Sequence, residues 1–255
     1  MSATDLDVVH VWRISLDEQP AVAVDRLGRL LSPMETERRA ALGTARARSR
    51  FTVAHGALRL ILSHRLEVPP HALRLRRGTW GKPEVTAPGG VPATRFSLSH
   101  SRGHALFAVT GRRAVGVDVE HHVGRPVTAL AVRHFPPAEG AAVRALGHRA
   151  GPLFAQLWTR KEACVKAAGA RLADGLVLPA GGAGPGLVVH DPDGRLPGPW
   201  RVRDLTAPPG CGAAVALAGT APYDVVELRF ASAVDDPDLS ASTQRPHAGR
   251  HIHDD

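Results

Sequence analysis

Residues 152–169 constrain the fold most, because they have both the ends and the period of a helix that packs on a core. Proline at the start and glycine at the end are typical of helix boundaries. Apolar residues recur along the segment at helical spacing: Leu153 and Phe154, Leu157 and Trp158, Cys164 and Val165, and Ala168. Lys161 and Glu162 stand where two further apolar residues belong. An unpaired buried charge is costly, so both side chains must be paired, bound to a ligand or exposed in a cleft.

A second pattern places two carboxylates on a strand. Residues 115–120 read Val-Gly-Val-Asp-Val-Glu, so the valines take one face while Asp118 and Glu120 take the other. With Glu162 they offer three oxygen ligands, the kind that Mg²⁺ prefers alongside waters and substrate phosphates. Lys166 follows Glu162 by one helical turn. A plain intrahelical ion pair between these two residues is the alternative to a chemical role.

The rest of the chain predicts mixed helices and strands. A strand at 8–14 precedes a helix start at Ser32, with proline next and glutamate three residues on. That helical region, broken near Gly43, runs towards Arg65. Further strands are expected at 73–76, at 105–110 and 114–120 as a hairpin, and at 187–189, 200–202, 213–217 and 225–230. Residues 231–255 have no apolar period and predict a disordered tail.

Composition excludes several classes of protein. The 255 residues, 44% of them hydrophobic, suffice for two small domains around a cleft. The acidic N-terminal stretch lacks the pattern of a signal peptide, and no apolar run reaches transmembrane length, so we expect a cytoplasmic protein without a membrane partner. Two distant cysteines suggest neither a disulfide framework nor a zinc site. The net charge of +8 predicts attraction to phosphates or to an acidic protein.

Lysine is rare in this basic chain. It occurs only at Lys82, Lys161 and Lys166, while arginine supplies the other cations. Lys82 lies in the loop 77–83, which reads Arg-Gly-Thr-Trp-Gly-Lys-Pro. Two glycines around a lone lysine allow a backbone to approach a ligand closely, although an ordinary turn has the same composition.

Two of these segments together resemble the signature of the 4′-phosphopantetheinyl transferase superfamily: Gly-Val-Asp-Val-Glu at 116–120 and Trp-Thr-Arg-Lys-Glu-Ala-Cys-Val-Lys at 158–166. Ser-Leu-Ser-His-Ser at 97–101 is similar to the family's Asn-x-Ser-His-Ser element, with Ser97 in place of asparagine. The loop 77–83 is similar to its Gly-Lys-Pro loop. The length matches the longer surfactin-synthetase-activating (Sfp) type and not the short trimeric synthases. The likeness covers roughly residues 32–169.

The resemblance implies an α+β fold of two similar α/β subdomains related by a pseudo-twofold axis, with the active site at their interface. We expect an N-terminal subdomain at 1–113, a C-terminal one at 114–230 and the tail at 231–255, in a monomer. It also implies a reaction in which Mg²⁺ and coenzyme A serve transfer of phosphopantetheine to a serine of an acidic apo acyl or peptidyl carrier protein. This is the holo-acyl-carrier-protein synthase reaction, which releases 3′,5′-adenosine diphosphate.

The same resemblance implies a role for each motif residue. The metal ligands are Asp118, Glu120 and Glu162, and Glu162 also serves as general base. Lys166 and Lys161 neutralise charge on the pyrophosphate. The residues expected to contact coenzyme A are Arg38, Arg50, Arg77, Lys82, Ser99, His100, Asp118 and Lys166. Of these, Arg77 and Lys82 hold the nucleotide end, while Arg38 and Arg50 hold the 3′-phosphate.

Two other functions share part of this pattern. A nucleic-acid-binding protein fits the charge, but aromatic residues make up only 4% of the chain and do not interleave with the arginines. A Mg²⁺-dependent phosphohydrolase shares the carboxylates but does not require the loop 77–83 and the segment 97–101 together. We therefore expect no nucleic-acid partner.

Overall fold

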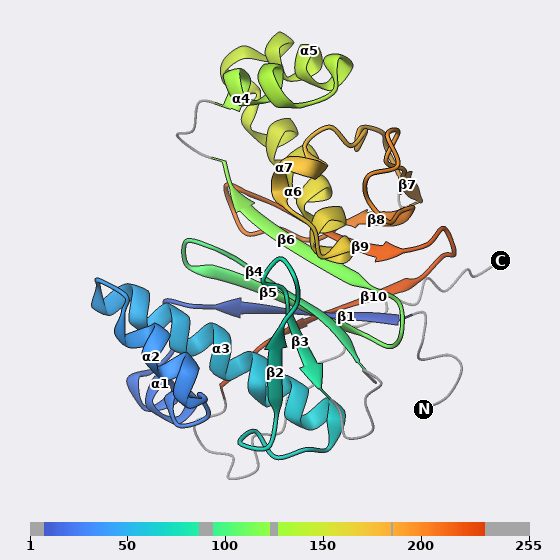
Figure 1. Cartoon of the computed structure of the whole chain (residues 1–255). Helices are drawn as coiled ribbons and strands as arrows, with labels where there is room; N and C mark the ends of the chain where they lie inside the picture. Colours follow the sequence, from blue (N-terminus) through green and yellow to red (C-terminus); the bar gives the residue numbers. More distant parts are fainter. Residues whose placement is uncertain (1–7, 87–93, 123–126, 185, 233–255) are drawn as a thin grey trace, which may run out of the picture.

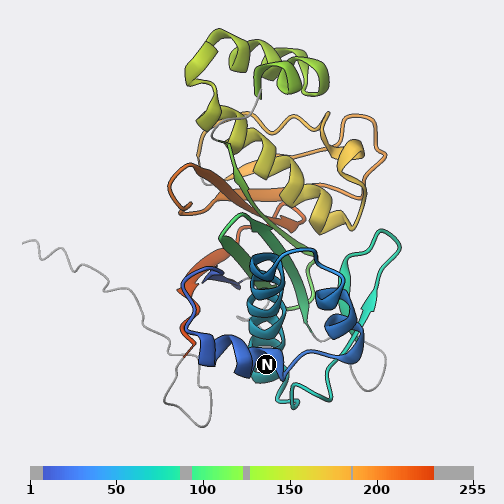
Figure 2. The same ribbon diagram turned by 90° about the vertical axis from the view of Figure 1, so that its left-hand side faces the viewer.

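The computed structural model describes residues 8–86, 94–122, 127–184 and 186–232. It confirms a mixed α/β protein built on two four-stranded sheets, a two-stranded hairpin and several helices. In Figures 1 and 2 the strands of both sheets lie between a long helix on one side and a second long helix on the other. Most of the predicted tail, residues 233–255, lies outside the described residues.

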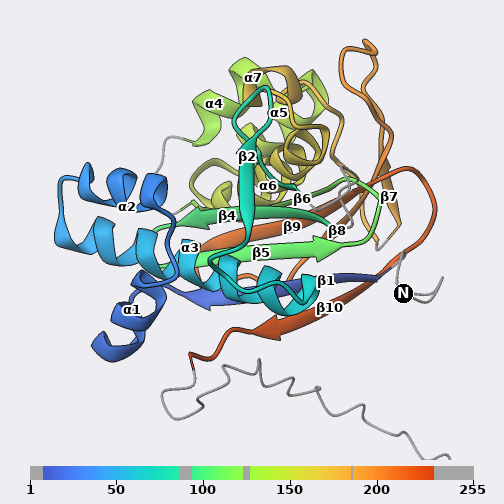
Figure 3. The same ribbon diagram turned by 60° about the horizontal axis from the view of Figure 1, so that its bottom comes forward.

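The first sheet has the order β10-β1-β5-β4, which Figure 3 shows from below. Its strands are β1 (Val8–Ser15), β4 (Arg95–Ser101), β5 (His104–Thr110) and β10 (Asp224–Arg229). The long helix α3 (Ala45–Leu66) covers one face, with α1 (Ala21–Gly28) and α2 (Pro33–Ala40) beside it. The Ser32 side chain and Glu35 form the predicted capping box at α2, and the chain breaks between Ala40 and Ala45, near the expected Gly43.

The second sheet has the order β6-β9-β8-β7. Its strands are β6 (Val115–His121), β7 (Leu187–Val189), β8 (Trp200–Asp204) and β9 (Cys211–Ala218). Helix α6 (Gly151–Ala168) covers it, as its sequence period predicts. Around α6 lie α4 (Val127–His134), α5 (Pro137–Ala145), the short turn η2 (Gly147–Arg149) and α7 (Leu172–Gly175). None of the described helices is long and apolar enough to span a membrane.

One expectation about strand pairing is wrong. The segments 105–110 and 114–120 are not a hairpin, because β5 pairs with β1 and β4 on its two edges, which leaves β6 to pair with β9. The chain also crosses between the two sheets near its C-terminal end. The last strand, β10, returns to pair in parallel with β1, so the first sheet takes its edge strand from the end of the chain.

The remaining hairpin, β2 (Arg74–Arg77) and β3 (Pro83–Thr86), carries the loop with the lone lysine. In Figure 1 it rises from the side of α3 towards α6. It therefore bridges the elements of the first sheet and those of the second.

Candidate active site

The centre of the site is an acid and a lysine brought together from strand β6 and helix α6. Asp118 is buried, with 3% of its surface exposed. Its Oδ1 accepts hydrogen bonds from the Ser99 hydroxyl at 2.7 Å and from Lys166 Nζ at 2.5 Å. Lys166 Nζ also donates to Ser99 Oγ at 2.8 Å. Three residues from β4, β6 and α6 thus form one closed triangle of hydrogen bonds.

Glu162 joins this triangle through the same lysine. Its Oε2 lies 3.5 Å from Lys166 Nζ, so the intrahelical ion pair expected as the alternative does exist. The pair is not isolated, however. Burial first, and then the negative charges of Asp118 and Glu120, raise the pKa of Glu162 above its usual range. The two predicted carboxylates of the strand and the glutamate of the helix therefore face one shared region.

The chemistry of this region fits a hard divalent cation. Asp118 Oδ2 is buried and has no hydrogen-bond partner among the described residues, so this oxygen is available to coordinate a cation. In the described part of the chain no three His, Cys, Asp or Glu side chains converge tightly enough to form a complete metal cage. Mg²⁺ does not need one, because it binds through one or two carboxylates and takes waters and phosphates for the rest. Asp118, Glu120 and Glu162 are the residues that would hold it.

A row of serines sets the position of β6 beside β4. Alternate hydroxyls on β4 accept hydrogen bonds from alternate backbone N–H groups of β6, at 3.2 to 3.4 Å. The pairs are Ser97 with Val117, Ser99 with Val119, and Ser101 with His121. Side chains thus replace a backbone ladder where the two sheets meet. The serine spacing at every second position was the only sequence signal for this arrangement, and only Ser99 had been assigned to the site.

Lys161 does not belong to this site, and its expected role at a pyrophosphate is wrong for this geometry. Its side chain is fully buried and points towards α5, where Nζ lies 2.6 Å from Glu139 Oε2 and also donates to the carbonyl of Leu178. The ring of Phe135 lies 4.6 Å from the same nitrogen. The ion pair with the largely buried Glu139 therefore explains how Lys161 can lie on the apolar face of α6. Nothing in the pattern around Glu139 identified that partner from sequence.

Lys82 is also engaged differently from the expectation. Its Nζ donates to two backbone carbonyls, Val115 at the start of β6 (2.8 Å) and Lys166 in the last turn of α6 (2.6 Å). Burial, followed by the charge of Arg95, lowers the pKa of Lys82 to about 8. Trp80, at the tip of the same hairpin, stacks under Arg171 at 3.9 Å. The hairpin loop is thus fastened to the helix that carries Glu162 and Lys166.

A cleft of about 650 Å³ opens beside these residues, on the face of β4 opposite Ser99. Arg38, Arg77 and His100 all line it, which brings together three of the residues expected at coenzyme A. Burial first, and then the charges of Lys166, His55 and Arg50, lower the pKa of His100. The cations that contribute to this shift would also attract an anion to the cleft.

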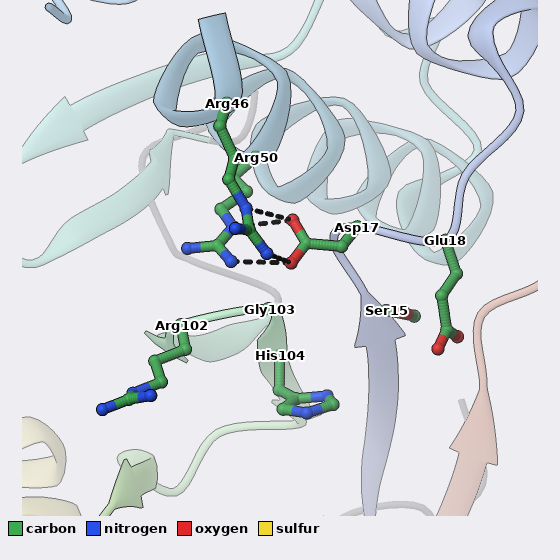
Figure 4. A pocket seen from close by; sticks show the side chains of 8 residues that line it. All are labelled: Ser15, Asp17, Glu18, Arg46, Arg50, Arg102, Gly103 and His104. Atoms are coloured by element: carbon green, nitrogen blue, oxygen red, sulfur yellow. Dashed lines mark hydrogen bonds and ion pairs between the residues drawn. The ribbon is translucent and has the colours of Figure 1, made fainter. Parts of the chain in front are cut away.

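Arg50 lines the adjoining cavity but is already paired. As Figure 4 shows, Arg50 and Arg46 both point at Asp17. Arg50 donates to the two carboxylate oxygens at 2.7 and 2.6 Å, and Arg46 lies 2.6 Å from the same group. These hydrogen bonds strongly lower the pKa of Asp17. Arg50, which was expected to bind the 3′-phosphate, therefore binds the carboxylate of Asp17 in this structure.

Comparison with known proteins agrees with these motifs. The family model described as the 4′-phosphopantetheinyl transferase superfamily matches residues 114–180, which include β6 and α6. The 4′-phosphopantetheinyl transferase HetI of Nostoc sp. is 34% identical over 218 residues, covering 84% of this chain and 89% of the Nostoc protein. A Synechocystis sp. protein provisionally named a 4′-phosphopantetheinyl transferase is 33% identical over 153 residues, covering 58% of this chain and 60% of its own.

Proposed function

Since this chain belongs to the 4′-phosphopantetheinyl transferase superfamily, we propose that it transfers phosphopantetheine from coenzyme A to a serine of an apo acyl or peptidyl carrier protein. The observation that carries the proposal is the convergence of Asp118, Glu162 and Lys166 on one face of β4, with an arginine-lined cleft on its opposite face. The carboxylates would bind a cation, and the cleft would bind anions. Both are needed by a reaction that cleaves a P–O bond in the bridge of a diphosphate.

In this mechanism Glu162 takes the proton of the carrier serine as its oxygen attacks the phosphorus next to the pantetheine arm. The new serine O–P bond forms as the diphosphate bridge breaks, and 3′,5′-adenosine diphosphate leaves with the bridging oxygen. Mg²⁺, held by Asp118, Glu120 and Glu162, supplies Lewis-acid stabilisation of the diphosphate charge when bound. Lys166 leaves its hydrogen bonds with Asp118 and Ser99 to donate to phosphate oxygens.

The finer assignments follow the same proposal. We assign the chain to the Sfp type, with pseudo-twofold halves, the holo-acyl-carrier-protein synthase reaction and a monomeric cytoplasmic form. A long helix over each of two four-stranded sheets supports the two halves. The net charge of +8 supports an acidic carrier as partner. Arg38, Arg77 and His100 are the proposed coenzyme A contacts that line the cleft. Ser99 and Lys166 would contact it from the carboxylate side of β4, whereas Lys82 and Arg50 bind protein groups away from that triangle.

The test is incubation of the protein with Mg²⁺, coenzyme A and an apo carrier protein, followed by mass spectrometry of the carrier. The expected result is a mass gain of one phosphopantetheine group, with one 3′,5′-adenosine diphosphate released per carrier modified. Cleavage of coenzyme A without a mass gain would instead identify a phosphohydrolase. Tests on carriers from fatty acid, polyketide and non-ribosomal peptide synthesis would then identify the pathway.

A further inference from the structure

Lys82 follows a tight turn that fixes where its side chain starts. The Gly78 N–H donates to the Lys82 carbonyl at 2.8 Å, and the Gly81 N–H donates to the Gly78 carbonyl at 2.9 Å. Gly81 has a φ of +84°, in a region that residues other than glycine rarely adopt. The loop between β2 and β3 is therefore closed by its own backbone, and it directs Lys82 away from the hairpin.

One acceptor of the Lys82 ammonium is a carbonyl at the end of helix α6. The last four carbonyls of a helix have no partner within it. The N–H of Gly169, which has a left-handed conformation, donates to the Val165 carbonyl. Lys82 Nζ donates to the next carbonyl, that of Lys166, at 2.6 Å. A cation is also favoured at this end of the helix dipole, so Lys82 stabilises the turn that carries Lys166.

The other acceptor is the carbonyl of Val115, the first residue of β6, at 2.8 Å. The N–H groups of every second residue of β6 face β4, where three serine hydroxyls bind them. The Val115 carbonyl continues this row, because the N–H and C=O of one residue point to the same side of a strand. Asp118 follows three residues later. One ammonium thus joins the strand that carries Asp118 to the helix that carries Lys166.

The hairpin of Lys82 also forms a wall of the cleft. Arg77 lines that cleft, and Val85 is buried in one cluster with side chains of α3. At the tip, the Arg171 guanidinium lies 3.9 Å from the centre of the Trp80 ring. The strands of the hairpin are therefore held by the first sheet and its helix, while its tip is held by the end of α6 and the residues that follow it.

We propose that Lys82 is a positioning residue, which holds Lys166 against Asp118 and is not a ligand of the substrate. The inference rests on the proposed function and replaces the role at the nucleotide end that the sequence resemblance implied. Two of the three donors of the ammonium already bind carbonyls, and a phosphate would have to displace them. Arginine is the usual cation of this chain, but a compact ammonium with rotatable donors suits two converging carbonyls better than a planar guanidinium.

Lys82→Met removes the ammonium and keeps most of the length of the side chain. We expect kcat for carrier modification, per folded molecule, to fall about tenfold or more, because small displacements of a reacting group are costly. The Kd for 3′,5′-adenosine diphosphate, measured by calorimetric titration of the full chain, should not change, since this molecule has the nucleotide end but no diphosphate. Amide hydrogen exchange should become faster at residues 115–118 and 165–170.

Lys161→Met is the matched control, because Lys161 also donates to a backbone carbonyl, that of Leu178, but faces away from the site. It should lower stability without changing kcat per folded molecule. A raised Kd for 3′,5′-adenosine diphosphate in Lys82→Met would show that Lys82 binds the nucleotide, and an unchanged kcat would show that it positions nothing. Either result overturns the inference. If the wild-type chain modifies no carrier, the proposed function fails, and unchanged hydrogen exchange at the two segments would then overturn the inference separately.

Discussion

Two lysines of helix α6 show how partners decide the role of a residue. Lys161 and Lys166 come from the same segment, yet the first is fully buried against Glu139 and the second bridges Asp118 and Glu162. Burial lowers the pKa of Lys161, even against the charge of Glu139. For Lys166 the two carboxylates outweigh burial and raise the pKa. One lysine therefore holds helices together, while the other lies between the carboxylates of the proposed active site.

Replacing each lysine by methionine should separate these roles. Lys161→Met leaves Glu139 buried without its counter-charge, so we expect about 3 to 5 kcal/mol lower stability but near-normal activity per folded molecule. Lys166→Met likewise leaves the buried carboxylate of Asp118 without its counter-charge, so it should also lower stability. Unlike Lys161→Met, it should reduce kcat per folded molecule by at least about a hundredfold, because it removes a cation from the diphosphate. Thermal melts and carrier modification rates check both. A Lys161→Met variant that folds normally but is inactive would contradict this account.

Glu35 predicts how acid acts on the protein. Burial alone would raise its pKa, but hydrogen bonds from His55, the Ser32 N–H and Arg59 hold that pKa at about 2. A depressed pKa means that the carboxylate stabilises the fold above pH 4.5 and that this contribution is lost as pH falls towards 2. The contribution is on the order of 3 kcal/mol. Melting temperatures of wild type and Glu35→Gln should therefore differ at pH 6 and converge towards pH 2. A constant difference would contradict the assignment.

At the scale of elements, the site depends on how closely β6 approaches α6. Gly116 lies so near the helix that a Cβ there would be 1.9 Å from the carbonyl oxygen of Ala163. Glycine near the start of this strand is thus required by a backbone contact, and it brings Asp118 close to Lys166. On the other side, the serine hydroxyls of β4 satisfy the N–H groups of β6.

Gly116→Ala should therefore push the helix away from the strand. We expect a loss of several kcal/mol in the free energy of unfolding, together with lower activity in whatever protein folds, because backbone atoms cannot yield as side chains do. Gly43→Ala is the control, since a Cβ there meets nothing within 4 Å. Urea unfolding of the two variants makes the comparison. Equal stabilities would show that β6 and α6 separate freely.

Sequence predicted those elements whose period or caps were strong. We could predict the boundaries of α6, the valine alternation of β6 and the cap of α2, because each depends on residues that are neighbours in the chain. Helices α4 and α5 and the pairing of β10 with β1 were not, since they depend on contacts between distant segments. For the same reason Asp118, Glu120 and Glu162 could be proposed as site carboxylates from local patterns, whereas the pairing of Glu139 with Lys161 and of Asp17 with Arg50 could not be predicted.

At the scale of the whole molecule, the two sheets pack against each other through a shared cluster of buried side chains. A cluster of buried side chains joins β1 and β5 of the first sheet to β6 and β9 of the second, with Val9, Val11 and Leu106 facing Val117 and Val215 among its members. Two further connections join the halves. Strand β10 pairs with β1, and Lys82 donates hydrogen bonds to the carbonyls of Val115 and Lys166. Each half therefore buries part of its apolar surface against the other half.

The protein should accordingly unfold as one unit. We expect a single calorimetric transition whose calorimetric and van't Hoff enthalpies agree, with no separate melting of the two sheets. A fragment of residues 1–113 should be unfolded or aggregated, since it lacks β10 and exposes Val9 and Val11. Two resolved transitions, or a well-folded fragment, would indicate independent subdomains.

The central claim is that the carboxylates and lysine between the two sheets carry out phosphopantetheine transfer. Glu162→Gln tests it most directly, because a neutral isostere at a site where burial penalises the carboxylate should fold at least as well as wild type. The measurement is the mass of an apo carrier protein over time with Mg²⁺, coenzyme A and each enzyme. We predict modification by wild type, and a rate at least about a hundredfold lower for Glu162→Gln with an unchanged melting temperature. A Glu162→Gln rate close to that of wild type would contradict the account.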